Sequence, residues 1–220
     1  MKRLLPVLLV LSLLLALPFQ AARAADAVSA ATAARYRESE VREYEGARLD
    51  PAVGPRDNSI KGIQQVDIED FRLTVGGLTD KEVVLTYDEV RAMEPQERLI
   101  TLYCVEGWDA TVLWRGVLLK DLMDLAGVKP EAVTVIFSAV DGYTTSIPLS
   151  EVLERELILA WGANGLDLPP SMGYPFIVVA QDKWGYKWAR WVSGITLSDD
   201  ANYLGFWEKL GYPNDADLMP

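Results

Sequence analysis

The sequence predicts a mixed α+β fold, rich in short β-strands and formed by a single domain. From Val66 onward the chain divides into short segments of alternating or continuous apolar residues, as strands do. A few short helical segments lie between these strands but do not follow each one, which argues against a doubly wound parallel sheet. The sequence also has neither GxGxxG nor GxxxxGK[ST], so no nucleotide site of those kinds is predicted.

The first 24 residues have the three parts of a secretory signal peptide. Lys2 and Arg3 give the positive end, residues 4–19 the apolar stretch, and residues 22–24 the small-x-small cleavage site. Two prolines shorten the uninterrupted apolar run, which favours cleavage over an uncleaved membrane anchor. We therefore expect an exported, periplasmic protein with no stable membrane insertion after the leader is removed.

Residues 25–59 are interpreted as an N-terminal extension that precedes the domain. Residues 25–48 are rich in Ala, Arg and Glu and contain few large apolar side chains, so an extended tail or weak helix is expected. Proline and glycine then break the chain between residues 51 and 55. A surface loop is expected at residues 57–65, where the domain begins.

The strands of the domain are predicted from β-type composition and from turn signals between them. In chain order they are residues 71–75, 82–86, 98–104, 110–114, 134–139, 143–147, 157–161 and 176–180. Dipeptides that favour tight turns lie between several of them, namely Gly76-Gly77, Arg115-Gly116, Asp141-Gly142 and Asn164-Gly165. One or two further strands are expected within residues 184–197.

Three short helices are expected between these strands. The first begins at a capping box, residues 86–89, and ends near residue 93. The second carries leucines at helical spacing over residues 118–125, and Gly127 suits its C-terminal cap. The third covers residues 151–156 and is expected to be capped by Ser150. The aromatic stretch YLGFWEKLGYP is expected to pack back on the domain, before a C-terminal tail at residues 213–220.

Composition excludes several classes of site. The chain has 21 basic and 32 acidic residues, and loss of the three basic residues of the leader leaves a net charge of 18 − 32 = −14. Such a surface repels nucleic acid and anionic lipid, so no nucleic-acid partner is expected. Histidine is absent, which rules out Ser-His-Asp and Cys-His catalysis and histidine metal sites. A single cysteine rules out Cys-rich zinc sites, iron–sulfur clusters and intrachain disulfides.

That cysteine, Cys104, lies in the stretch LYCVEGWDA. It ends a predicted strand and enters a loop, and loops held by rigid strands often carry functional groups. Gly107 permits close backbone approach, and Trp108 offers a large wall to a pocket. Cys104 is then a nucleophile, a redox sensor or a soft ligand of a metal held mostly by other groups. The alternative is a buried structural thiol, which is common for free cysteine.

A second candidate site is the stretch DKWGYKWARW, residues 182–191, in which cations alternate with aromatic rings. If it is extended, its side chains divide between two faces, with Trp184, Tyr186, Trp188 and Arg190 on one and Lys187, Ala189 and Trp191 on the other. Such a stretch suits an anionic, planar ligand, through charge and stacking. The alternative is a core strand with packed aromatic side chains. The stretch SAVDGYTTSIPL is interpreted as a hairpin without a catalytic role.

Taken together, these motifs resemble the sulfite-oxidase-type molybdopterin domain. LTVGGL, LTYDEV, LYCVEGW, DGYTTSIPL, NGLDLPP, GYPF and WGYKWARWV occur in that family's order, and the resemblance covers roughly residues 60–212. It implies a mixed α+β fold around a molybdenum–molybdopterin cofactor, with Cys104 giving a thiolate to the metal. It further implies that the cofactor is bound by Lys187, Trp188 and Arg190, the last standing where the family commonly has lysine.

The resemblance implies an oxidoreductase that exchanges an oxygen atom with a small sulfite-like or sulfoxide-like substrate. Because no CxxCH haem-attachment motif is present, electrons would pass to a separate protein or subunit. Some features depart from the family: histidine is absent, and Met172 and Ile177 stand where relatives that reduce methionine sulfoxide carry asparagine and arginine. The leader also lacks a twin-arginine pair. These departures favour a second hypothesis, a cofactor-free binding or scaffold module. A third is a thiol-based redox protein that uses Cys104 alone.

Overall fold

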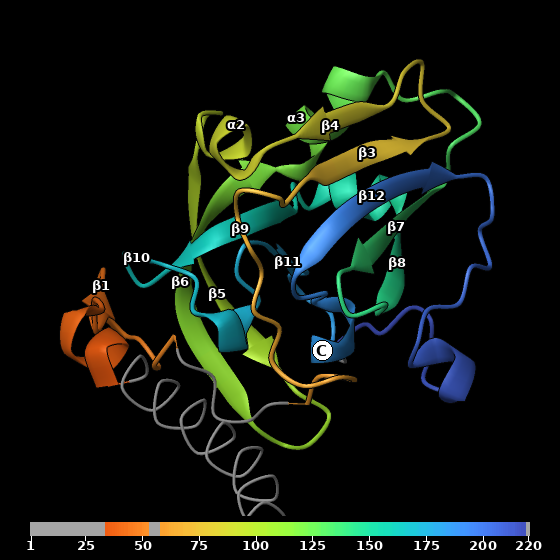
Figure 1. Cartoon of the computed structure of the whole chain (residues 1–220). Helices are drawn as coiled ribbons and strands as arrows, with labels where there is room; N and C mark the ends of the chain where they lie inside the picture. The colour runs from red at the N-terminus through yellow and green to blue at the C-terminus, as the bar shows by residue number, and fades with distance from the viewer. Residues whose placement is uncertain (1–33, 53–57, 219–220) are drawn as a thin grey trace, which may run out of the picture.

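The computed structural model describes residues 34–52 and 58–218, which form a β-rich domain with few short helices. The predicted leader lies outside the described residues. Two five-stranded sheets account for most of the fold, and Figure 1 shows them side by side, with β9 and β6 in one and β12, β7 and β8 in the other. The predicted single-domain, mixed α+β fold is therefore confirmed.

The first sheet has the order β10-β9-β6-β5, and β11 pairs with β9 beyond this path. All its pairings are antiparallel. Its strands are β5 (Gln96–Tyr103), β6 (Asp109–Leu118), β9 (Ile158–Ala163), β10 (Leu166–Asp167) and β11 (Ile177–Val179). The longest pairing joins β5 to β6, and its two strands are connected by the loop that contains Cys104.

The second sheet has the order β4-β3-β12-β7-β8. Its strands are β3 (Leu73–Gly77), β4 (Val83–Leu85), β7 (Thr134–Ala139), β8 (Thr144–Pro148) and β12 (Val192–Ser198). Only β3 and β12 are parallel, which places the last strand of the domain in the centre of the sheet between β3 and β7. The chain therefore returns to the sheet's middle directly after the aromatic stretch of residues 182–191.

The helices confirm most of the cap signals. They are α2 (Tyr87–Arg91), α3 (Leu119–Ala126) and α4 (Leu149–Glu154), with 3₁₀ turns η1 (Pro170–Met172), η2 (Gly185–Lys187) and η3 (Glu208–Leu210). Thr86 and Glu89 form the predicted capping box of α2, and Gly127 follows α3 with a positive φ of 74°. The prediction that Ser150 caps α4 is wrong. Ser150 lies inside this helix, because Pro148 already turns the chain from β8 into its first residue.

Two predicted turns are also wrong, because their glycines lie inside strands. Gly76 and Gly77 are the last residues of β3. Arg115 and Gly116 lie within β6, where the pairing with β9 shifts between them as in a β-bulge. A Cβ on Gly116 would lie 2.2 Å from the carbonyl oxygen of Leu159. This glycine therefore allows two strands to approach closely, and a sequence pattern does not distinguish that role from a turn.

Of the one or two strands expected within residues 184–197, one is present as β12, but residues 184–191 before it are not extended. Residues 185–187 form η2, and β12 begins only at Val192. Trp191 has a positive φ of 53°, which interrupts any extended run before β12. Trp188 and Trp191 are both buried despite their odd spacing, so a two-sided alternation does not describe this segment. The irregular backbone instead buries Trp188 and Trp191 directly before β12.

The N-terminal extension is attached to the domain by polar contacts. Residues 34–39 are helical, and β1 (Glu43–Tyr44) and β2 (Ala47–Arg48) form a two-stranded hairpin. The buried Glu40 carboxylate accepts hydrogen bonds from Ala52 N at 2.7 Å and from Asn164 Nδ2 at 3.2 Å. Of the extended tail or weak helix expected here, residues 34–39 are helical, and the buried Glu40 carboxylate and Asn164 amide satisfy each other where the extension meets the domain.

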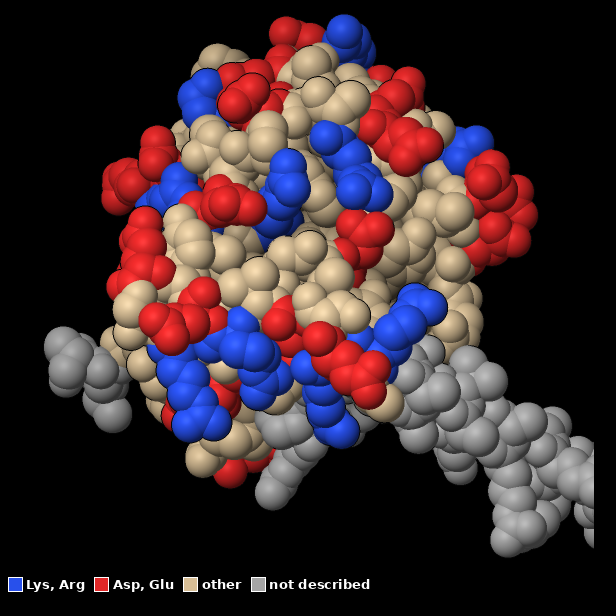
Figure 2. Space-filling view, turned by 90° about the vertical axis from the view of Figure 1, so that its left-hand side faces the viewer, with Lys and Arg blue, Asp and Glu red and all other residues tan. Residues whose placement is uncertain are grey.

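The core consists of apolar side chains from both sheets and from α3. Trp114 of β6, Phe137 of β7 and Leu122 of α3 are completely buried. Burying each such side chain contributes about 1.5–3 kcal/mol. On the surface, Figure 2 shows acidic and basic side chains interspersed over one face rather than gathered by sign. Within the described residues, no helix combines the length and hydropathy that crossing a membrane requires.

Candidate functional site

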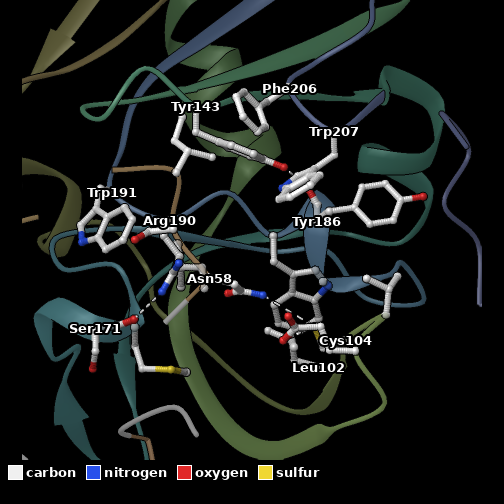
Figure 3. Close-up of a pocket in the computed structure, with 18 of the residues that line it drawn as sticks. Asn58, Leu102, Cys104, Tyr143, Ser171, Tyr186, Arg190, Trp191, Phe206 and Trp207 are labelled. Atoms are coloured by element: carbon white, nitrogen blue, oxygen red, sulfur yellow. Dashed lines mark hydrogen bonds between the residues drawn. The ribbon is translucent and has the colours of Figure 1, made fainter. Parts of the chain in front are cut away.

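A cavity of about 450 Å³ opens where the end of β5, the β7–β8 turn and residues 184–191 meet a C-terminal segment, residues 199–217. This volume lies in the range of about 300–1,000 Å³ that is typical of small-molecule and cofactor sites. Its walls are largely aromatic, and Figure 3 shows Tyr143, Phe206 and Trp207 on one side with Cys104 on the other. The cavity is therefore built from segments far apart in the sequence.

Cys104 lies at the start of the tight loop that joins β5 to β6. Its N–H donates to Trp108 O at 2.8 Å, and the N–H of Gly107 donates back to Cys104 O at 3.0 Å. Gly107 has a positive φ of 83°, which glycine adopts without strain. The loop is thus closed by backbone hydrogen bonds. It holds the thiol, which is 5% exposed, at the cavity surface.

Two polar side chains approach the sulfur of Cys104. Asn58 Nδ2 lies 3.7 Å from Sγ, and the Glu106 carboxylate oxygen Oε2 lies 4.0 Å from it. Figure 3 shows the Asn58 amide directed across the cavity toward Cys104. Glu106 also accepts a hydrogen bond from Trp108 Nε1 at 3.1 Å. The sulfur therefore has an amide donor and a carboxylate as neighbours.

Gly185 allows η2 to pack against the end of β5. Tyr103 and Trp184 form an isolated parallel bridge. A Cβ on Gly185 would lie 3.2 Å from Tyr103 O and 3.7 Å from the Cα of Cys104. The glycine in WGYKW thus brings the aromatic stretch close to the thiol, and the two motifs that the sequence singled out meet here.

Trp188 and Arg190, two residues predicted to contact a cofactor, line the same cavity as Cys104. Trp188 donates its Nε1–H to Lys183 O at 3.1 Å and packs against Trp114 with a centroid distance of 5.6 Å. Arg190 donates to Ser171 O at 2.7 Å, and its guanidinium lies 4.4 Å from the ring centroid of Trp191. Both side chains are thus held in fixed orientations at the cavity wall.

Lys187, the third residue of that prediction, is not among the described residues that line the cavity. Its ammonium is buried and donates to Glu208 Oε1 at 2.6 Å, to Ser146 O at 2.9 Å and to Asn214 Oδ1 at 3.0 Å. Burial lowers the pKa of Lys187, while its hydrogen bond to Glu208 opposes that shift. The structure therefore connects Lys187 to β8 and to the C-terminal segment.

The C-terminal segment supplies cavity residues that the sequence did not indicate. Phe206, Trp207 and Tyr212 all line the cavity. Phe206 N donates to Thr144 O at 2.8 Å, which joins the segment to the start of β8. The aromatic density of YLGFWEKLGYP was the available signal, and it predicted only that this stretch packs on the domain. Asn58, Glu106 and Asp141 also line the cavity, and no pattern had marked them as site residues.

Two tyrosines at the cavity are kept protonated by their surroundings. The Tyr143 hydroxyl donates to Tyr186 O, and the Tyr186 hydroxyl donates to Pro213 O at 2.8 Å. Burial raises the pKa of Tyr143, and the nearby Glu208 carboxylate adds to the effect. Burial likewise raises the pKa of Tyr186 to about 12. Both hydroxyls are therefore hydrogen-bond donors near neutral pH.

Asp217 anchors the end of the C-terminal segment and should make stability depend on acid pH. It accepts from Lys183 Nζ at 2.7 Å, and this bond holds the pKa of the Asp217 carboxyl below its usual value, with Arg155 adding to the effect. A carboxyl lowered in this way stabilises the fold above its unfolded pKa of about 3.9, and the stabilisation is lost as pH falls through the folded value. Asp217→Asn should lower the urea midpoint near neutral pH and converge with wild type as the pH falls through the lowered pKa of Asp217. Parallel midpoint profiles across this range would contradict the assignment.

Comparison with known proteins identifies similarity over most of the described domain. Residues 60–207 match the family model of the oxidoreductase molybdopterin binding domain. The uncharacterized oxidoreductase YuiH of Bacillus subtilis is 37% identical over 152 residues, which are 69% of this chain and 76% of that protein. The putative protein-methionine-sulfoxide reductase subunit YedZ1 of Azospira oryzae is 32% identical over 151 residues, 68% of this chain and 57% of that protein.

Among solved structures, the sulfane dehydrogenase SoxCD of Paracoccus pantotrophus has a similar fold. The TM-score is 0.62 at 22% sequence identity, and the match covers 73% of this chain and 49% of that one. The chain thus spans about half of this structure and just over half of the Azospira relative.

Proposed function

The chain belongs to the sulfite-oxidase-type family of oxidoreductase molybdopterin-binding domains. We propose that it is a molybdenum–molybdopterin-dependent oxidoreductase that exchanges an oxygen atom with a small substrate. The observation that carries the proposal is a buried thiol, that of Cys104, at the surface of a cofactor-sized cavity. The domain is proposed to span residues 60–212, between the extension at 25–59 and the tail at 213–220.

The residues of the cavity fit such a cofactor. A thiolate is a soft donor, and no histidine or second cysteine in the chain competes for the metal. The aromatic walls suit the planar pterin, and Arg190 offers a cation for an anionic group. We therefore propose that Cys104 ligates molybdenum and that Trp188 and Arg190 contact the pterin. Lys187 would contribute to cofactor binding indirectly, because its hydrogen bonds hold the C-terminal segment, which forms one wall of the cavity, against β8.

The bound cofactor would supply oxygen-atom transfer and two-electron redox chemistry. The chain's own residues would bind the cofactor, orient the substrate and exclude water from the site. Asn58 Nδ2, 3.7 Å from the Cys104 sulfur, can donate a hydrogen bond to a group held beside that sulfur. Tyr186 and the aromatic side chains of the C-terminal segment limit access of water from the opposite wall.

The substrate is proposed to be sulfite-like or sulfoxide-like, and the electron partner a separate protein or subunit. The Azospira relative is named as a putative reductase subunit, which supports an assembly of more than one chain. The predicted leader supports export to the periplasm as the working location. A redox-active centre without a haem or second cofactor motif in the chain needs such a partner to complete its cycle.

A cofactor-free binding module is the second candidate, and one observation favours it. Met172 and Ile177 line the cavity, so part of its wall is apolar. Such a wall binds an apolar ligand without any metal. The two candidates differ in whether protein from its native host carries molybdenum.

Elemental analysis tests the proposal. We expect about one molybdenum atom per chain in protein purified from the exported fraction of the native host, released together with a fluorescent pterin after acid oxidation. The native leader has to be retained, because the export route determines where the cofactor is inserted. Protein free of both molybdenum and pterin would overturn the enzyme proposal and support the binding module.

A further inference from the structure

Glu106 places a carboxylate at the reactive end of the cavity. Its Oε2 lies 4.0 Å from the sulfur of Cys104. The hydrogen bond from Trp108 Nε1, 3.1 Å long, fixes the carboxylate on that side. The loop itself is closed by the backbone bond from Cys104 N to Trp108 O at 2.8 Å. The negative charge is therefore held beside the sulfur by this hydrogen bond, although the Glu106 side chain is exposed to solvent.

The other charged residues that line the cavity leave its net charge negative. The charged side chains among its described lining residues are Glu106, Asp141 and Arg190, two acids and one base. Asp141 is 3% exposed and accepts a hydrogen bond from Tyr143 N at 2.9 Å. Arg190 donates to Ser171 O and lies over the ring of Trp191. The whole chain carries a net charge of −11, which also disfavours the approach of anions.

The proposed function assigns Arg190 to the cofactor, so this cation is not available to bind the substrate. An oxyanion substrate would then meet two carboxylates, with no second cation among the described lining residues. An uncharged molecule meets no such repulsion, and aromatic walls such as Trp108 and Trp207 favour its organic groups. Repulsion between two like charges at about 4 Å, the separation of Glu106 Oε2 from the Cys104 sulfur, amounts to roughly a fivefold effect in bulk water and falls off as the substrate's charge lies farther away.

We propose that Glu106 makes the site selective for an uncharged oxide, of the sulfoxide or N-oxide class, over an oxyanion such as sulfite. The inference rests on the proposed function and names the substrate class of that site. For a sulfoxide the balanced reaction is R₂SO + 2H⁺ + 2e⁻ → R₂S + H₂O, with the electrons supplied by a one-electron carrier. The S–O bond is broken, the sulfur is reduced and the oxygen leaves as water.

The first experiment compares two substrates on molybdenum-loaded protein. Dimethyl sulfoxide reduction is measured with reduced benzyl viologen as donor, and sulfite oxidation with ferricyanide as acceptor. We expect a higher kcat/KM for the sulfoxide in wild type. In Glu106→Gln the sulfite-to-sulfoxide ratio of kcat/KM should rise roughly three- to tenfold at low ionic strength and less in high salt. Glu131→Gln, the same change at an exposed position before β7, is the matched control and should leave the ratio unchanged.

The second experiment needs no cofactor. Metal-free protein is treated with anionic, neutral and cationic methanethiosulfonate reagents, and each rate at Cys104 is divided by the rate with 2-mercaptoethanol. We expect the anionic reagent to be slowest and the cationic one fastest. The ratio of the normalised rate of the cationic reagent to that of the anionic reagent should fall roughly three- to tenfold in Glu106→Gln and stay unchanged in Glu131→Gln. The experiment compares reagents of different charge at the same thiol. A general loss of packing would change all three rates alike and would not reproduce this pattern.

The outcomes separate the inference from the proposed function. Molybdenum-loaded protein that prefers sulfite would overturn the inference and leave the function standing. Protein without molybdenum would overturn the function, and the reagent rates would still decide whether the cavity rejects anions. Equal normalised rates for the three reagents in wild type, or an unchanged ratio of the cationic to the anionic rate in Glu106→Gln, would show that Glu106 does not select by charge.

Discussion

Cys104→Ser should remove molybdenum from the protein while leaving the fold intact. A serine hydroxyl is a hard, protonated group at neutral pH and does not replace a thiolate as a soft metal ligand. The side chain is small, lies at the cavity surface, and its backbone hydrogen bonds to Trp108 and Gly107 do not involve the sulfur. We therefore expect the metal content to fall to background and substrate turnover to fall with it.

The measurement is molybdenum per chain, together with circular dichroism and the urea midpoint. Ser193→Ala, a comparably small change in β12, is the control and should retain the metal. Cys104→Ala should behave like Cys104→Ser, which separates loss of the ligand from a new interaction of the hydroxyl. Full molybdenum content in a folded Cys104→Ser protein would rule out the cysteine as the ligand.

Lys187→Met should destabilise the protein by about 3–5 kcal/mol, the usual effect of removing one partner of a buried ion pair. The ammonium of Lys187 and the carboxylate of Glu208 are 2.6 Å apart, and their side chains are 1% and 0% exposed. Without the lysine, Glu208 remains charged in a buried site with only the Thr145 hydroxyl, at 2.7 Å, as a described donor. Urea unfolding followed by tryptophan fluorescence measures the loss.

The double variant Lys187→Met with Glu208→Leu keeps this prediction testable if the single variant does not fold. It removes the uncompensated charge, so it should recover a large part of the lost stability. The exposed pair Lys120–Asp124 on α3 is the matched control, and Lys120→Met should cost less than about 1 kcal/mol. A Lys187→Met protein as stable as the Lys120→Met protein would show that the buried pair contributes nothing.

The sequence predicted best those elements whose signals are local. The hairpin of β7 and β8 with its turn at Asp141-Gly142, and the Asn164-Gly165 turn after β9, were confirmed. Gly142, Asn164 and Gly165 have the positive φ that tight turns require. Cys104 was placed correctly at the exit of its strand. A capping box or turn depends on a few neighbouring residues, so it can be recognised without knowing the rest of the fold.

The errors arose where distant packing decides the local structure. Gly116 was interpreted as a turn, but it accommodates the backbone of Leu159 from another strand. Residues 184–191 looked extended, but the approach of Gly185 to Tyr103 and the buried tryptophans impose an irregular path. Neither neighbour is near in sequence, so periodicity does not reveal them.

The candidate site shows the same division. Cys104, Trp188 and Arg190 were identified from sequence and line one cavity, but Glu106 and the wall of the C-terminal segment were not. The carboxylate of Glu106 lies in the best motif of the chain, yet its distance from the sulfur depends on how the loop closes. Phe206 and Tyr212 line the cavity from the segment that Glu208, through its ion pair with Lys187, helps to hold to the domain.

The cavity joins Asn58 to Tyr212, which are 212 − 58 = 154 positions apart in the chain. A partly synthesised chain that has not reached Tyr212 has Cys104 and its loop but lacks an entire wall. In such a chain Cys104 is present, but the cavity around it is not yet closed. If the proposed cofactor binds in this cavity, its loading therefore has to follow synthesis of the C-terminal segment.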